Sequence, residues 1–162
     1  MNRKIRAIVL LSMLLMLCAL SVFARSSGKS AVGTWKLDTS KSSYSNLPAP
    51  KFEQLVIATD EPKALKWTLN GASTDGKTFN SSYDGPIDSQ YHPVVSSQGN
   101  DTVAYTRTPD GGVQWTVKDN SGTVIEAGSS QLSADGNTLT LKGTLSGPNG
   151  KGNFVSVFTK MQ

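Results

Sequence analysis

The chain is poor in the residues that most often build disulfides, metal sites and catalytic centres. It contains one cysteine, Cys18, and one histidine, His92. A single cysteine allows no disulfide within the chain, and a single histidine cannot form a histidine-rich zinc site. Neither a G-x-S-x-G nucleophile motif nor a glycine-rich phosphate-binding loop occurs in the sequence. We therefore expect no metal, no cofactor and no enzymatic activity.

Excess charge is also absent once the first residues are set aside. The whole chain carries 16 Lys and Arg against 12 Asp and Glu, which gives a net charge of +4. Arg3, Lys4 and Arg6 supply three of these positive charges, so the remaining chain has a net charge of 4 − 3 = +1. A balanced surface of this kind does not favour nucleic acid as a partner, and we expect none.

The first 24 residues have the three parts of a signal peptide. The basic start is followed by the apolar run 7–20, and Val22-Phe23-Ala24 offers a cleavage site after Ala24. The run is too short for a comfortable membrane span, which needs about 20 apolar residues. We expect a secreted or periplasmic protein with no membrane span after cleavage. In that protein Cys18 is removed, 25–30 is a disordered polar leader, and 31–162 is the folded domain.

Residues 31–162 alternate between short β-patterned runs and turn signals. In the run 64–70, for example, Leu65, Trp67 and Leu69 alternate with polar residues, which is typical of a strand with one buried face. Because proline cannot donate to a sheet, Pro48 and Pro50 predict that 39–50 is a loop with at most one helical turn. The runs that we expect to form strands are 32–38, 51–59, 64–70, 77–83, 90–95, 102–108, 113–118, 122–132, 138–145 and 153–160.

Turn-forming dipeptides that accept the positive φ of tight hairpins punctuate these runs. They are Asn70-Gly71, Asp75-Gly76, Asp84-Gly85, Asp110-Gly111, Asp135-Gly136 and Asn149-Gly150, with weaker versions at Ser121-Gly122 and Ser146-Gly147. About eight to ten strands at hairpin spacing predict an all-β, antiparallel up-and-down meander. Closure into a barrel would remove the exposed sheet edges and enclose side chains or one small ligand. A Greek-key β-sandwich is the alternative, because the pattern does not fix the order of the strands.

The stretch AVGTWKL at 31–37 resembles the first strand of the calycin barrels, the group of lipocalins and fatty-acid-binding proteins. The Gly-x-Trp signature of that group matches Gly33-Thr34-Trp35, and the resemblance implies that Trp35 plugs the closed end of the barrel. The whole pattern is similar to secreted bacterial lipocalin-like proteins of uncharacterised function. In lipocalins a basic residue of the last strand commonly stacks on the tryptophan, which would here be Lys160.

The chain also departs from these families. The loop 39–50 is too short for the two lid helices of fatty-acid-binding proteins. The Arg and Tyr with which those proteins hold a carboxylate near the C-terminus have no counterpart in 154–160. That fatty-acid site is therefore not carried over to this chain. The disulfide and C-terminal helix of many lipocalins are missing as well.

The candidate ligand-binding residues are Trp67, Tyr105, Arg107 and Trp115. Arg107 shares a strand face with Tyr105, and a guanidinium that points into a barrel needs a partner because an unpaired buried charge is costly. That partner is expected to be Glu126 or the carboxylate of a ligand, unless Arg107 faces solvent or has only a structural role. His92 and the carboxylates Asp84 and Asp88 fall near expected turns, where solvated roles are the simpler interpretation.

Two functional hypotheses follow from these observations. The first is an exported, monomeric, non-enzymatic binding protein for an apolar or amphipathic small molecule, because such pockets are mostly apolar with few polar anchors. The second is a structural or interaction module of the cell envelope, with a packed interior. The two differ in whether the barrel holds an open cavity.

Overall fold

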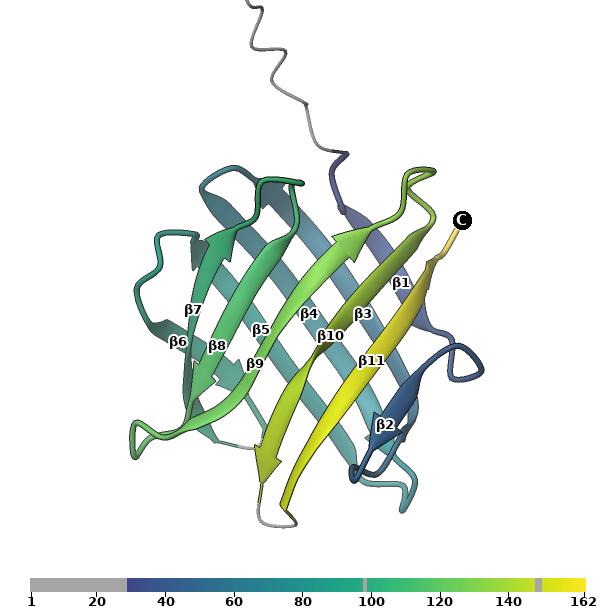
Figure 1. Cartoon of the computed structure of the whole chain (residues 1–162), viewed down its shortest axis with the longest axis vertical. Coiled ribbons are helices and arrows are strands. Elements are labelled where there is room, and N and C mark those ends of the chain that lie inside the picture. The colour runs from purple at the N-terminus through teal and green to yellow at the C-terminus, as the bar shows by residue number, and fades with distance from the viewer. Residues whose placement is uncertain (1–28, 98, 148–149) are drawn as a thin grey trace, which may run out of the picture.

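The computed structural model describes residues 29–97, 99–147 and 150–162, and within these ranges the chain is all β and has no helix. Ten antiparallel strands form a closed up-and-down barrel, and a short additional strand, β2, extends its wall (Figure 1). The strands are β1 (Gly33–Leu37), β2 (Ser43–Ser45), β3 (Pro50–Glu61), β4 (Ala64–Ser73), β5 (Thr78–Pro86), β6 (His92–Ser96), β7 (Asn100–Arg107), β8 (Val113–Lys118), β9 (Val124–Leu132), β10 (Thr138–Gly147) and β11 (Gly150–Lys160).

The predicted meander and its closure into a barrel are confirmed, and the sandwich alternative is wrong. The barrel closes where β1 pairs with β11, with Trp35 opposite Lys160 and Leu37 opposite Phe158. The signal peptide expected at 1–24, Cys18 and leader residues 25–28 lie outside the described residues. Within the described ranges, no helix has the length and hydropathy needed to cross a membrane.

The segment 39–50 is not simply a loop, and the helical turn allowed for it is absent. Its residues Ser43–Ser45 form β2, which pairs with β11 beyond the point where β1 ends, with Tyr44 opposite Phe154. The Ser42 hydroxyl accepts a hydrogen bond from the backbone N–H of Val157 at 2.9 Å, which ties the start of this segment to β11. β2 thus pairs with a part of β11 that lies beyond the end of β1.

Four of the eight predicted turn dipeptides lie in hairpin turns. Ser146-Gly147 instead forms the end of β10, and of Asn149-Gly150 only Gly150, the first residue of β11, lies within the described residues. The glycines of Asp75-Gly76, Asp110-Gly111 and Asp135-Gly136 have φ values of 84°, 90° and 77°, and each lies between two paired strands. Gly122 of Ser121-Gly122, with φ of 82°, likewise lies in the turn between β8 and β9.

The turns predicted at Asn70-Gly71 and Asp84-Gly85 are wrong, because both glycines lie inside strands. An aromatic ring covers each of them. A Cβ on Gly71 would meet the Phe79 ring at 2.3 Å, and one on Gly85 would meet the Tyr83 ring at 2.9 Å. Glycine here makes room for a ring rather than for a turn.

The buried core lies toward one end of the barrel. Along β4, Leu65 is buried, whereas Trp67 and Leu69 on the same face are only partly buried. β8 shows the same gradient, from a buried Val113 to partly buried Trp115 and Val117. Since all these side chains point inward, the loss of burial along each strand means that the barrel is filled at the end near Trp35 and hollow toward the other end.

Candidate functional site

The barrel encloses a cavity of about 1000 Å³, which is at the upper end of the usual size for a small-molecule site. Apolar side chains of β3, β4, β5, β7, β8, β10 and β11 supply much of its wall. They include Leu55, Leu69, Phe79, Val103, Val117, Leu141 and Phe154.

Trp35 closes the filled end of the barrel. It is 0% exposed, and its indole N–H donates to the carbonyl of Ala31 at 2.8 Å. The Lys160 Nζ lies 5.3 Å from the centre of the Trp35 ring, which confirms the stacking expected between them. Gly33 has φ of 146°, and a Cβ there would lie 2.6 Å from the Lys160 side chain. Gly33 is therefore favoured chiefly by its positive φ, and it also leaves room for the Lys160 side chain to pass.

Arg107 lies at the same end and is held by Asp60. One guanidinium nitrogen donates to Asp60 Oδ1 at 2.6 Å and to the carbonyl of Glu61 at 2.5 Å, and another donates to the carbonyl of Gly111 at 3.1 Å. Asp60 Oδ2 accepts the backbone N–H of Ala31 at 2.6 Å. Arg107 therefore has the structural pairing that the sequence left open as an alternative, and its partner is Asp60 rather than Glu126.

A hydrogen-bonded aromatic group forms the middle of the cavity wall. The Trp67 indole N–H donates to the Tyr105 hydroxyl at 2.9 Å, and the rings of Tyr105 and Tyr83 lie 5.0 Å apart at 57°. Burial raises the pKa of Tyr105, which keeps its hydroxyl neutral. The ring of Trp67 is left as an apolar surface facing the cavity.

Three carboxyl groups line the hollow part of the cavity: Glu53 of β3, Asp101 of β7 and Glu126 of β9. The Trp115 indole N–H donates to Glu126 Oε1 at 2.7 Å. Burial raises the pKa of Glu53 to about 7, and the charge of Glu126 adds to that rise. Burial also raises the pKa of Glu126; the indole hydrogen bond opposes this rise and the charge of Asp101 adds to it. Among the described residues, none of these carboxyls forms an ion pair.

All four predicted ligand-binding residues, Trp67, Tyr105, Arg107 and Trp115, line this cavity. Glu53 and Asp101 were not predicted as site residues, although strand periodicity places both on the inward face. Glu53 has the same parity as the inward Leu55, and Asp101 has the same parity as the inward Val103.

The other polar residues singled out from the sequence lie away from the cavity. Asp84 is exposed and pairs with Lys66 at 2.6 Å. The His92 Nε2 lies 2.9 Å from Asp88 Oδ1, on a part of the chain that does not line the interior. In the described ranges, no three His, Cys, Asp or Glu side chains are grouped so that they could hold a metal ion.

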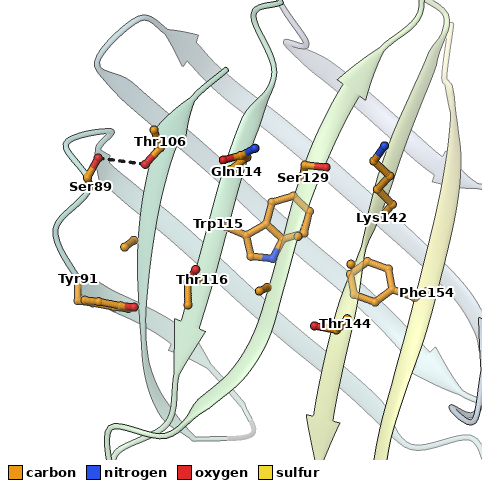
Figure 2. A pocket seen from close by; sticks show the side chains of 14 residues that line it. Ser89, Tyr91, Thr106, Gln114, Trp115, Thr116, Ser129, Lys142, Thr144 and Phe154 are labelled. Atoms are coloured by element: carbon orange, nitrogen blue, oxygen red, sulfur yellow. Dashed lines mark hydrogen bonds between the residues drawn. The ribbon is translucent and has the colours of Figure 1, made fainter. Parts of the chain in front are cut away.

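Figure 2 shows a second hollow, a shallow depression on the outer face of β7 to β10. At its centre Gly128 and Gly143 are direct partners in the sheet. On the inner face a Cβ at Gly128 would meet the Trp115 ring at 2.5 Å, and one at Gly143 would meet the Phe154 ring at 3.0 Å. The depression is mostly rimmed by small polar side chains, among them Thr106, Gln114, Thr116, Ser129 and Thr144. Because this depression lies on the outer surface and is exposed to solvent, the barrel interior is the better candidate for a binding site.

Comparison of the chain with protein-family models and with curated protein sequences gave no match.

Proposed function

We propose that this protein is an exported, non-enzymatic, lipocalin-like carrier of an apolar or amphipathic small molecule. The observation that carries the proposal is the cavity of about 1000 Å³ with a largely apolar wall. A ligand that fills such a space removes apolar surface of both the ligand and the protein from water. Each Å² of apolar surface buried in this way contributes roughly 25 cal/mol to binding. The cavity also favours this hypothesis over a structural module, which would have a packed interior.

Dense packing at one end of the barrel supports entry of a ligand from the other end. Trp35, Lys160 and the Arg107–Asp60 pair occupy the end where the chain enters β1. The inward side chains at the other end are less buried, as Trp67 and Trp115 show. A ligand would therefore enter from the end that carries the β4–β5 and β8–β9 hairpins, with its apolar part against the tryptophans.

The test is a fluorescence titration with N-phenyl-1-naphthylamine, an uncharged apolar probe. We expect saturable binding of one probe per chain, with energy transfer from Trp67 and Trp115. Leu69→Trp, which fills the cavity, should weaken binding at least tenfold. Thr68→Trp places the same side chain on the outer face of β4 and should leave binding unchanged. Absence of saturable binding, or equal effects of the two variants, would refute the proposal.

A further inference from the structure

The polar groups of the cavity differ in whether they are already engaged. The indole N–H groups of Trp67 and Trp115 donate to Tyr105 and Glu126. Arg107 makes three hydrogen bonds within the protein, to Asp60, Glu61 and Gly111. The positive charge of Arg107 is balanced by Asp60, whose side chain is only 8% exposed. These donors are thus committed before any ligand arrives, and the guanidinium offers little to a ligand carboxylate.

Acceptors, in contrast, remain available on the cavity side. Glu126 uses Oε1 for the Trp115 indole, while Glu53 and Asp101 line the same hollow and take part in no ion pair in the described ranges. Glu53 and Glu126 line the same cavity, and the charge of Glu126 raises the pKa of Glu53, so the two carboxylates repel each other. A cation placed between them would relieve that repulsion and replace lost hydration.

The basic residues near the cavity do not fill this role. Lys77 lies in the β4–β5 hairpin, where its side chain is 85% exposed and its Nζ pairs with Asp75 at 2.9 Å. Lys29 donates to the carbonyl of Ala134 at the closed end. Neither lysine pairs with Glu53 or Glu126.

We propose that the ligand is an amphiphile whose polar end is a protonated amine, held by the carboxyl groups of Glu53 and Glu126 while its apolar part packs on Trp67 and Trp115. This inference rests on the proposed function and specifies its ligand. It reverses the expectation from fatty-acid carriers, in which a basic residue receives a carboxylate.

The test uses two probes of equal chain length and opposite charge. Dodecylamine and dodecanoate, each below its micelle concentration, compete with N-phenyl-1-naphthylamine for the purified protein at pH 8. We expect the amine to displace the naphthylamine at a concentration at least tenfold below that of the carboxylate. Glu53→Gln with Glu126→Gln should reduce this preference to less than threefold, and Asp84→Asn, on the outer face, should leave it unchanged.

The pH dependence is a second readout. Glu53 shares the cavity wall with Glu126, Asp101 and Tyr44, and burial raises its pKa to about 7. Because Glu53 gains a proton below that value while dodecylamine stays charged, the amine itself should displace the naphthylamine less effectively at pH 5 than at pH 8. Equal or stronger displacement by dodecanoate at pH 8 would overturn the amine inference while leaving the carrier function intact. Failure of the naphthylamine to bind at all would overturn both.

Discussion

Replacing Arg107 by methionine removes the charge at the closed end of the barrel and keeps most of the apolar stem. The lost guanidinium makes three hydrogen bonds, of 2.6, 2.5 and 3.1 Å, to Asp60, Glu61 and Gly111. The Asp60 side chain, only 8% exposed, would keep its bond from the Ala31 N–H and lose its counter-charge. We therefore expect a large loss of stability.

The magnitude follows from the exposure of the pair. Removing one partner of a fully buried ion pair costs about 3–5 kcal/mol. The Arg107 side chain is 22% exposed, so water can reach part of the site after substitution. The expected cost is thus about 3 kcal/mol, at the lower end of that range, with a fall in Tm of about 10 °C for a domain of this size.

Urea unfolding followed by tryptophan fluorescence measures this cost, with an unchanged m-value as the sign of two-state behaviour. Lys66→Met is the matched control, because it breaks an exposed pair with Asp84 whose side chains are 52% and 69% exposed. It should cost less than about 0.5 kcal/mol. If Arg107→Met cost no more than Lys66→Met, the structural role assigned to Arg107 would be refuted.

Two further predictions concern the pH dependence of stability and the packing of the sheet. The folded-state pKa of Glu53, about 7, lies above its ordinary value of 4.5, so stability should fall as pH rises between these values. The unfolding free energy of Glu53→Gln should therefore equal that of the unsubstituted protein near pH 4 and exceed it by about 2 kcal/mol at pH 8. This is less than the full pKa shift would give, because water in the cavity screens part of the charge. Parallel pH profiles of stability for the two proteins would contradict this prediction. Gly143→Val should cost at least about 2 kcal/mol, because a Cβ there would lie 2.2 Å from the Ala127 carbonyl oxygen and 3.0 Å from the Phe154 ring. Thr144→Val, on the outer face beside it, should change unfolding free energy by less than about 0.5 kcal/mol, and equal costs in urea unfolding would show that the glycine is not required.

The barrel could be predicted from the sequence because its signals are local. Alternation along each strand and the Asp-Gly hairpins at Gly76, Gly111 and Gly136 are read within a few residues. The two false turns at Gly71 and Gly85 show the limit of such reading. Asn70-Gly71 has the composition of a turn, and only the Phe79 ring on the next strand reveals why glycine lies there.

The sequence predicts which side chains of the site point into the barrel, but it does not predict which of them form hydrogen bonds or ion pairs with one another. Strand parity correctly points Arg107 and Glu126 inward, yet it does not say how far along the barrel axis each lies. That distance depends on the register of every intervening strand pair. In the structure it brings Arg107 to Asp60 and leaves Glu126 to the Trp115 indole.

The pairing between β1 and β11 means that the barrel can close only after nearly the whole domain has been synthesised. Trp35 and its partner Lys160 are the first and nearly the last parts of the domain to be made. Until the final residues emerge, the growing sheet keeps two unsatisfied edges and an uncovered indole, which are the features that invite aggregation. Completion of the ring therefore depends on the last residues of β11, and a chain truncated before Phe158 would lack all three residues that are paired with β1.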